Sequence, residues 1–543
     1  MSAPTSAPAL SEDRPDRAAR DVVREAGRRR TFAIISHPDA GKSTLTEALA
    51  LHARVIGQAG AVHGKAGRRG TVSDWMDMER DRGISITSAA LQFSYRDTVV
   101  NLLDTPGHAD FSEDTYRVLT AVDAAVMLID AAKGLETQTM KLFAVCKHRG
   151  IPVLTVVNKW DRPGKDALEL MDEISERTGL TPTPLTWPVG IAGDFRGVLN
   201  RADGSYRRFT RTAGGATIAP EETLSADAAA AREGDAWQQA VEEVDLLAAT
   251  GADHDQSLFL DGVTTPVLFA SAVSNFGVGA LLDTLVALAP PPADAVDADG
   301  GTRALAEPFS AFVFKVQAGM DAAHRDRLAF IRICSGMFER GMVVTHGKSG
   351  RPFATKYAQQ VFGRERESID VAYPGDVVGL VHAAALAVGD TLYADQPVSY
   401  PPLTTFAPEH FAVCHSKDPS KHKQFRKGIS QLDSEGVVQV LRSERRGDGT
   451  PVLAAVGPMQ FEVAVHRMEH EFGAPIELDR LPYSLALRTD AASAAGVAAA
   501  RGAEVLQRTD GTLLGVFTDK WGLRVLQQNK PELTLEPLVA AQL

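Results

Sequence analysis

Short apolar segments recur along the first half of the chain, and most of them lead directly into a polar or glycine-containing motif. The segments are five to seven residues long, which predicts buried strands. Helical patterns lie between them, and strands that alternate with helices are typical of a parallel sheet covered by helices. The predicted strands are Thr31–Ser36, Thr98–Leu103, Ala124–Asp130, Pro152–Asn158 and Pro266–Ala270.

The stretch between Asp161 and Ser271 is longer than one helix and one strand require. It contains an Asp203-Gly204 pair, which favours a hairpin turn, and an Ala- and Glu-rich pattern that predicts a helix near 221–249. We therefore expect an inserted subdomain over about 190–262.

The second half of the chain changes character at two proline-rich breaks, 290–301 and 400–408. Between them, short apolar runs separated by glycines predict a β-barrel, and the final region mixes helical and strand patterns. We expect a disordered or helical N-terminal extension over residues 1–27 and a nucleotide-binding domain over 28–290. A linker over 291–303 would lead to a β-barrel domain over 304–400 and an α+β domain over 401–543.

Composition narrows the class of protein. A chain of 543 residues is too long for one core, and its formal charge of −12 excludes indiscriminate coating of nucleic acid. No segment has the length and apolarity of a membrane span, and residues 1–30 lack the apolar centre of a signal peptide, so we expect a cytoplasmic protein. The three cysteines, Cys146, Cys334 and Cys414, have no spacing typical of a zinc site.

The first motif follows strand 31–36. Gly41, Lys42 and Ser43 lie between this strand and a helix, where backbone N–H groups, a lysine and a hydroxyl bind phosphates and magnesium. The usual first glycine of such a phosphate loop is replaced by Ser36, so this motif alone is weak evidence.

Two further motifs complete a nucleotide site. Asp104 directly follows the next predicted strand and is placed to hold magnesium through water, while the N–H of Gly107 would sense the γ-phosphate. Asn158 ends a later strand and Asp161 follows it closely, and a carboxylate there accepts two hydrogen bonds from guanine that adenine does not offer. Lys159 would lie over the base, with the N–H groups near Ser271 and Ala272 facing its 6-oxo group.

His108 follows Gly107 directly and would reach a water in line with the γ-phosphate. A surface histidine usually has no such role, but at this position we favour catalysis. The sequence therefore predicts a GTP-hydrolysing enzyme.

The Asp104–His108 run and the Arg82-Gly-Ile-Ser-Ile-Thr87 run resemble those of the translational GTPases, the superfamily of elongation factors G and Tu. Within it the closest resemblance is to the peptide chain release factor 3 family, and it extends from about residue 28 to the end. The segments that carry it are Arg30–Ser43, Ser73-Asp74-Trp75-Met76, Phe111–Arg117 and His324-Arg325-Asp326-Arg327.

The resemblance implies an α/β P-loop GTPase domain with an insertion, a β-barrel domain and an α+β third domain. It also implies that Ser85 or Thr87 reaches the magnesium ion from the first switch, and that Pro38 and Ile84 form an apolar gate beside His108. The implied magnesium ligands are Ser43, Ser85 and Asp104. The residues expected to bind GTP or GDP are Ser36, His37, Pro38, Asp39, Ala40, Gly41, Lys42, Ser43, Thr44, Asp104, Thr105, Pro106, Gly107, His108, Asn158, Lys159, Asp161, Ser271 and Ala272.

The function that the resemblance implies is a monomeric, ribosome-stimulated GTPase of translation termination, which removes class I release factors after peptide release. Its partners would be ribosomal RNA, ribosomal proteins and those release factors, with no membrane or DNA. The alternatives are a ribosomal GTPase of quality control or stress response, a nucleotide-dependent binding module without useful hydrolysis, and a metabolic P-loop kinase. The kinase would not need the guanine-reading residues Asn158–Asp161.

A cluster of cations near the start of the third domain predicts a ribosome contact on an otherwise acidic chain. The cluster comprises Lys417, Lys421, Lys423, Arg426 and Lys427, and a solvated loop is the alternative interpretation.

Overall fold

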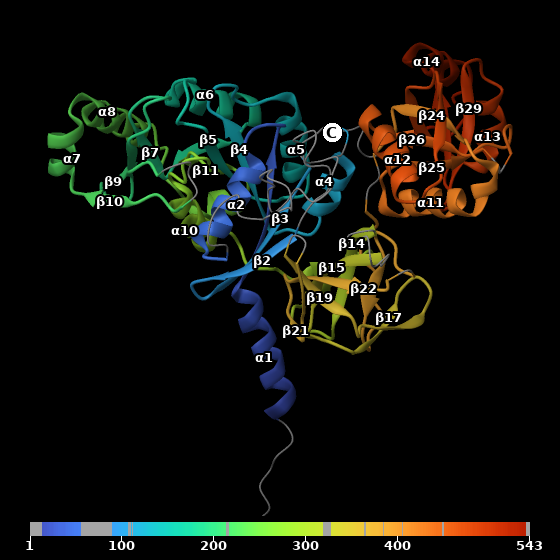
Figure 1. Cartoon of the computed structure of the whole chain (residues 1–543), viewed down its shortest axis with the longest axis horizontal. Helices are drawn as coiled ribbons and strands as arrows, with labels where there is room; N and C mark the ends of the chain where they lie inside the picture. The colour runs from blue at the N-terminus through green and yellow to red at the C-terminus, as the bar shows by residue number, and fades with distance from the viewer. Residues whose placement is uncertain are drawn as a thin grey trace, which may run out of the picture.

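Three large sheets, of seven, eight and eight strands, dominate the structure, which is a computed structural model (Figure 1). The residues that it describes are 13–55, 90–106, 110, 112–212, 217–318, 327–362, 365–383, 385–403, 406–447 and 450–538.

The first sheet has the strand order β2-β3-β1-β4-β5-β11-β6. All neighbouring strands are parallel except β2, which runs antiparallel to β3 at one edge. The five strands predicted from the sequence are all present, with ends that differ by no more than two residues. The strands are β1 (Arg29–Ser36), β2 (Ala90–Tyr95), β3 (Thr98–Asp104), β4 (Ala124–Asp130), β5 (Val153–Asn158), β6 (Thr181–Pro184) and β11 (Thr264–Phe269).

Helices cover both faces of this sheet because its strands are apolar on both sides. Phe32 and Ile34 of β1 belong to one core with helices α2 (Lys42–His52) and α10 (Val278–Leu288). Ala33 and Ile35 point to the opposite core. The helices of that second core are α4 (Ser112–Leu119), α5 (Thr137–His148) and α6 (Ala167–Thr178).

The region between β6 and β11 holds a second, four-stranded sheet of order β10-β9-β8-β7. The predicted hairpin is present, because β8 (Gly197–Asn200) and β9 (Tyr206–Phe209) pair antiparallel around Asp203-Gly204. The prediction of one helix near 221–249 was wrong, since the chain there forms a strand and two helices, broken at Gly234 with φ 58°. The remaining elements are β7 (Thr186–Val189), β10 (Glu221–Leu224), α7 (Ala226–Glu233), α8 (Asp235–Ala249) and α9 (Gln256–Leu260).

The second large sheet is the predicted β-barrel, and its pairings are all antiparallel. The proline-rich segment before it contains a two-stranded ribbon, because the Asp297 carboxylate accepts hydrogen bonds from the N–H groups of Asp299 and Gly301 and turns the chain back. The ribbon consists of β12 (Ala295–Val296) and β13 (Thr302–Arg303). A second pair is formed by β16 (Phe338–Glu339) and β21 (Val371–Ala372). The strands of the barrel are β14 (Ser310–Ala318), β15 (Arg327–Ser335), β17 (Val343–His346), β18 (Arg351–Ala354), β19 (Ala358–Phe362), β20 (Glu365–Ser368), β22 (Val377–Val381) and β23 (Thr391–Tyr393).

The third sheet, with its helices, forms the α+β region at the upper right of Figure 1. None of the helices in the described ranges is both long and apolar enough to cross a membrane. The helices are α11 (His422–Glu435), α12 (Pro458–His470), α13 (Ala491–Ala498) and α14 (Lys520–Asn529), with the short helix η3 (Pro419–Lys421) before α11. The strands are β24 (His410–Ser416), β25 (Gln439–Arg442), β26 (Val452–Ala455), β27 (Ile476–Leu481), β28 (Leu485–Thr489), β29 (Ala503–Arg508), β30 (Leu513–Phe517) and β31 (Glu536–Pro537).

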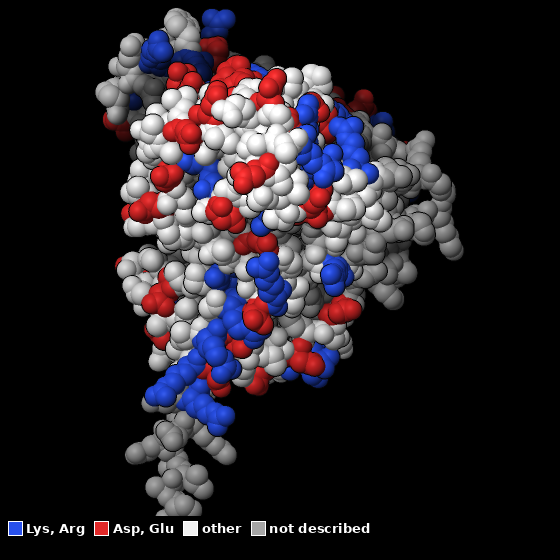
Figure 2. Space-filling model, turned by 90° about the vertical axis from the view of Figure 1, so that its left-hand side faces the viewer, with Lys and Arg blue, Asp and Glu red and all other residues white. Residues whose placement is uncertain are grey.

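Helix α1 (Asp13–Gly27) projects from the first sheet. Blue arginine side chains run along it at the lower end of Figure 2, interrupted by red carboxylates. Four arginines and four acids balance within the helix, and Arg24 pairs with Asp21 at 3.1 Å. This charge balance favours a solvated helix.

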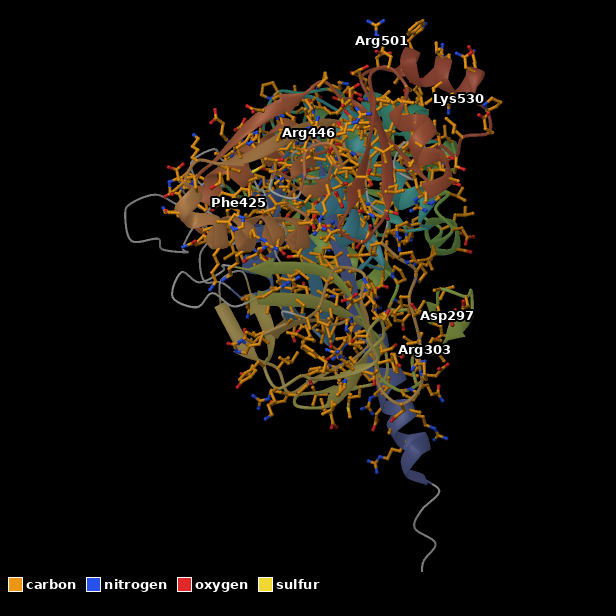
Figure 3. The ribbon with its side chains drawn as sticks, turned by 90° about the vertical axis from the view of Figure 1, so that its right-hand side faces the viewer. Asp297, Arg303, Phe425, Arg446, Arg501 and Lys530 are labelled. Atoms are coloured by element: carbon orange, nitrogen blue, oxygen red, sulfur yellow. The ribbon has the colours of Figure 1, made fainter. Side chains whose placement is uncertain are left out.

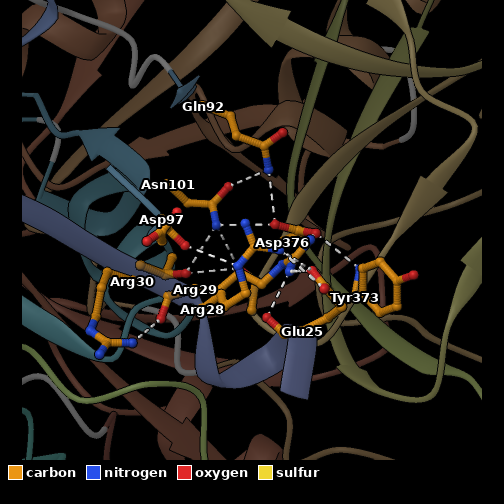
Figure 4. Close-up of polar contacts among 11 residues, drawn as sticks. Glu25, Arg28, Arg29, Arg30, Gln92, Asp97, Asn101, Tyr373 and Asp376 are labelled. Carbon is orange, nitrogen blue, oxygen red and sulfur yellow. Dashed lines mark hydrogen bonds and ion pairs between the residues drawn. The ribbon is translucent and has the colours of Figure 1, made fainter. Parts of the chain in front are cut away.

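The first sheet and the barrel meet at a buried polar cluster (Figure 4). The Nε of Arg29, at the start of β1, donates to Asp376 in the loop before β22 at 3.1 Å. The other Asp376 oxygen accepts from Gln92 at 2.9 Å and from Asn101 at 3.3 Å. Burial raises the pKa of the Asp376 carboxyl even though Arg29 opposes the shift. The cluster joins β1, β2 and β3 to one barrel loop.

Candidate nucleotide site

The loop between β1 and α2 needs backbone conformations that most side chains disfavour. Gly41, the residue before α2, has φ 97°, and Asp39 has φ 66°. A Cβ atom on Gly41 would lie 2.6 Å from the Nδ2 of Asn158, so the glycine is required by both conformation and space. The loop therefore brings the N-terminus of α2 against the end of β5.

Lys42 and Asp104 lie together beneath this loop. Their side chains are 6% and 1% exposed, and the Lys42 Nζ is 3.9 Å from an Asp104 oxygen. The register of β1 and β3 places Asp104 beside Ile34, and the Thr105 hydroxyl donates to the Ile34 carbonyl at 2.6 Å. Ser43 occupies the first turn of α2, next to Lys42. The structure thus brings together a lysine, a carboxylate and a helix N-terminus, which is the donor set for a phosphate group with a divalent cation.

Asn158 connects three loops at the carboxyl edge of the sheet. Its Nδ2 donates to the Ala40 carbonyl at 2.8 Å, and its Oδ1 accepts from the Ala272 N–H at 3.0 Å. The side chain is buried, so these bonds fix the phosphate loop and the Ser271-Ala272 loop relative to β5.

Lys159 adds a second connection to the phosphate loop. Its residue has φ 63°, and its Nζ donates to the Asp39 carbonyl and pairs with Asp130 at 2.9 Å. Although burial opposes it, the hydrogen bond from Lys159 keeps the pKa of Asp130 below its ordinary value. Asp130 was missed in the sequence analysis. Its position as the last residue of β4, at the same sheet edge, was the signal that would have identified it.

Asp161 follows on a loop held beside β11. The Trp160 N–H donates to the Ala270 carbonyl at 3.2 Å, and the Trp160 ring meets Phe269 edge-on, with centroids 4.9 Å apart. Asp161 is half-buried at this point, and Ser271 is fully buried in the loop that follows β11. The parallel pairing of β5 with β11 therefore brings the predicted base-reading residues together.

His37 has a different environment from its neighbours in the loop. The ring is buried, lies 3.7 Å from a Glu136 oxygen, and has its pKa lowered by burial. The Ser36 hydroxyl donates to the carbonyl of His37 at 3.0 Å, within the loop itself. Pro38 and Thr44 lie on the same loop and helix, and Pro106 follows Thr105.

Several predicted site residues lie outside the residues that the structure describes. They are Gly83, Ile84, Ser85 and Thr87 in the first switch, and Gly107 and His108 after the Asp104–Pro106 turn.

Comparison with known proteins supports the architecture just described. Three family models match in order: the elongation factor Tu GTP binding domain over residues 27–291, elongation factor G domain 2 over 308–395, and the class II release factor RF3 C-terminal domain over 400–527. A protein of Gloeobacter violaceus called peptide chain release factor 3 is 46% identical over 94% of this chain and 98% of its own length. The chain belongs to the peptide chain release factor 3 family.

Other relatives agree with this assignment. A protein of the same name from Symbiobacterium thermophilum is 45% identical over 95% of this chain and 98% of its own length. Another, from Synechocystis, is 48% identical over 87% of this chain and 87% of its own length. A crystal structure of a Thermus thermophilus protein has a TM-score of 0.67 at 21% identity, over 89% of this chain and 71% of that one, which supports the fold alone. The chain is thus a translational GTPase of termination that binds guanine nucleotide and hydrolyses GTP.

Proposed function

We propose that this termination GTPase acts on the ribosome after peptide release and promotes dissociation of the class I release factor, as a cytoplasmic monomer. The observation that supports this most strongly is the release-factor-type C-terminal region behind a GTPase domain. The same region gives no support to the alternative role in quality control or stress response. We propose the domain boundaries 28–290, 304–400 and 401–543, with the insertion over about 190–262.

We propose that the triphosphate lies over the N-terminus of α2. The backbone of residues 36–41 would cradle the phosphates, Lys42 would neutralise their charge, and Thr44 would contribute from the first turn. The burial of Lys42 beside Asp104 supports this, because a phosphate group and a cation would complete the charge balance there. Mg²⁺ would be held by Ser43, Asp104 and Ser85, and when bound it neutralises charge that develops on the phosphates.

We propose that guanine lies between the Asn158–Asp161 loop and the Ser271-Ala272 loop. The carboxylate of Asp161 would accept hydrogen bonds from N1–H and the 2-amino group, and the Lys159 stem would cover one face of the base. The fixed contacts of Asn158 with Ala40 and Ala272 support this role, because they set the distance between base and phosphate subsites.

We propose His108 as the catalytic residue that positions the attacking water, with Pro38 and Ile84 forming a gate beside it. Since the gate would have to open before His108 reaches the water, turnover is expected to be slow in isolation and faster on ribosomes.

The function is tested on ribosomes from which the peptide has been released and to which a labelled class I release factor remains bound. Adding the protein with GTP is expected to accelerate release-factor dissociation, whereas a Lys42→Ala variant is expected to leave the rate unchanged. Acceleration by that variant equal to wild type, or no acceleration by wild type, would contradict the proposal. Activity only on stalled ribosomes that carry a peptide would favour the quality-control alternative.

A further inference from the structure

The third domain carries an exposed basic surface on a chain of net charge −12. It comprises Lys417, which precedes η3, and Lys423, Arg426 and Lys427 of α11, and all four side chains are exposed. Among the residues that the structure describes, none of these four forms an ion pair with a carboxylate. We call these four residues the basic α11 surface.

Packing fixes which side of α11 faces solvent. Phe425, Ile429 and Leu432 are buried in the core that α11 shares with the third sheet. Residues 423, 426, 427 and 430 therefore line the opposite side of the helix. Since the helix is anchored along its buried side, the three cations that it carries project from fixed backbone positions on its solvent-facing side.

Three acids in this region have other partners. Asp418, the only acid between residues 415 and 430, accepts hydrogen bonds from the N–H of Ser420 at 2.9 Å and from its hydroxyl at 2.6 Å, and lies beside the half-buried Lys421. Asp479 pairs with His415 at 3.2 Å. At the far end of α11, Glu435 pairs with Arg467 at 2.7 Å. The positive charge of the surface is thus left for an external partner.

We propose that the basic α11 surface binds the phosphate backbone of ribosomal RNA. The proposal rests on the proposed action at the ribosome and names the part of the chain that contacts it. Phosphate is the group that this surface suits, because clustered lysines and arginines without acid partners bind phosphates through sequence-independent electrostatics. Phe425 of α11 is buried and therefore unavailable to stack on a base.

The first test compares two triple variants that each remove three exposed cations. The test variant is Lys423→Gln, Arg426→Gln and Lys427→Gln. The control is Arg501→Gln, Lys520→Gln and Arg524→Gln, around the start of α14, where all three side chains are also exposed. Figure 3 shows Phe425 of α11 and Arg501 at opposite ends of the third domain.

Ribosome binding is measured with a non-hydrolysable GTP analogue over a range of salt concentrations. We expect the ribosome affinity of the α11 variant to fall by about tenfold or more at low salt. The slope of log affinity against log salt concentration should decrease in magnitude by roughly one for each phosphate that the variant no longer binds. The control is expected to resemble wild type. An α11 variant that keeps wild-type affinity and slope, or an equal loss in both variants, would overturn the proposal.

A second test separates RNA from ribosomal protein as the partner. Ser430 is exposed on the same side of α11, whereas the native cysteines are buried, so Ser430→Cys gives one accessible thiol for a photo-crosslinker. We expect crosslinks to ribosomal RNA, and crosslinks to ribosomal protein alone would contradict the proposal. GTP binding by every variant checks that the first domain is folded, while failure of wild type to bind ribosomes would contradict the proposed function instead.

Discussion

At the residue scale, we propose that nucleotide choice depends on the carboxylate of Asp161. Replacing that carboxylate would then remove a pair of charge-assisted hydrogen bonds to guanine, each worth about 1.5–3 kcal/mol. We predict that Asp161→Asn shifts preference from GTP toward XTP, whose 2-oxo group accepts a hydrogen bond from the new amide. Competition binding of the two nucleotides measures the shift. Unchanged selectivity would remove the basis for assigning Asp161 to the base.

His108 gives a prediction about rate rather than affinity. The His108→Ala variant is expected to bind GTP like wild type but to lose ribosome-stimulated hydrolysis by roughly 10²–10⁴-fold, the range typical of acid–base groups. Single-turnover hydrolysis with saturating ribosomes measures this effect. A variant that hydrolyses GTP at the wild-type rate under those conditions would exclude His108 from catalysis.

The sequence predicted that the strand-end motifs would share one sheet edge, but not the bonds that hold them there. Gly41, Lys42 and Asp104 follow strands whose carboxyl ends share one edge, so their proximity follows from the α/β alternation. The contacts of Asn158 with Ala40 and Ala272 join residues more than one hundred positions apart, and no local pattern encodes them. The ion pair of Asp130 with Lys159 was not predictable in the same way, since Lys159 lies on the next strand's loop, although the position of Asp130 at the end of β4 was a usable signal.

At the element scale, β1 has a distinct role at each of its ends. Its carboxyl end leads into the phosphate loop, while its amino end places Arg29 in the cluster with Asp376. Arg29 also pairs with Glu25 of α1 at 2.6 Å and lies over the Tyr373 ring, 4.7 Å from its centroid. One strand therefore connects the nucleotide loop, the projecting helix and the barrel.

We predict that Arg29→Met lowers the free energy of unfolding by about 3–5 kcal/mol, because it leaves Asp376 buried without its cationic partner. The control is Arg24→Met, since Arg24 is exposed and its ion pairs should contribute about 1 kcal/mol or less. Denaturant unfolding measures both. Equal midpoints for the two variants would mean that the Arg29–Asp376 pair does not stabilise the contact between sheet and barrel.

Element prediction succeeded where the hydrophobic pattern is continuous. The strands β4 and β5 are buried along their length, and the sequence located both to within one residue. The edge strand β2 was not predicted, because the analysis relied on continuous apolar runs, whereas the buried residues of β2 alternate with more exposed ones, which is the pattern of a half-buried strand. The single helix predicted near 221–249 was wrong, because helical composition continues across Gly234 while the helical backbone does not, and residues 221–224 form a strand.

At the scale of the whole molecule, the third domain contacts Asp110, a few residues after the Asp104–Pro106 turn. The Asp110 carboxylate accepts a hydrogen bond from the N–H of Met459 at 2.6 Å, in the first turn of α12. Gly457 permits this approach, since a Cβ atom there would lie 2.1 Å from the Asp110 carboxyl carbon. Arg117 of α4 donates to the Glu435 carbonyl at 3.4 Å, at the end of α11.

These contacts connect the turn that would sense the γ-phosphate with the domain whose α11 surface we expect to meet RNA. We predict that Asp110→Ala keeps GTP affinity but lowers ribosome-stimulated hydrolysis by about tenfold or more. The reason is that one charge-assisted hydrogen bond is worth about 1.5–3 kcal/mol, while a tenfold change in rate corresponds to about 1.36 kcal/mol. Glu469→Ala, an exposed position of the same α12, is the control and should match wild type. If Asp110→Ala also keeps the wild-type stimulated rate, ribosome binding is communicated to the nucleotide site by another route, and the contact between Asp110 and α12 only holds the two domains together.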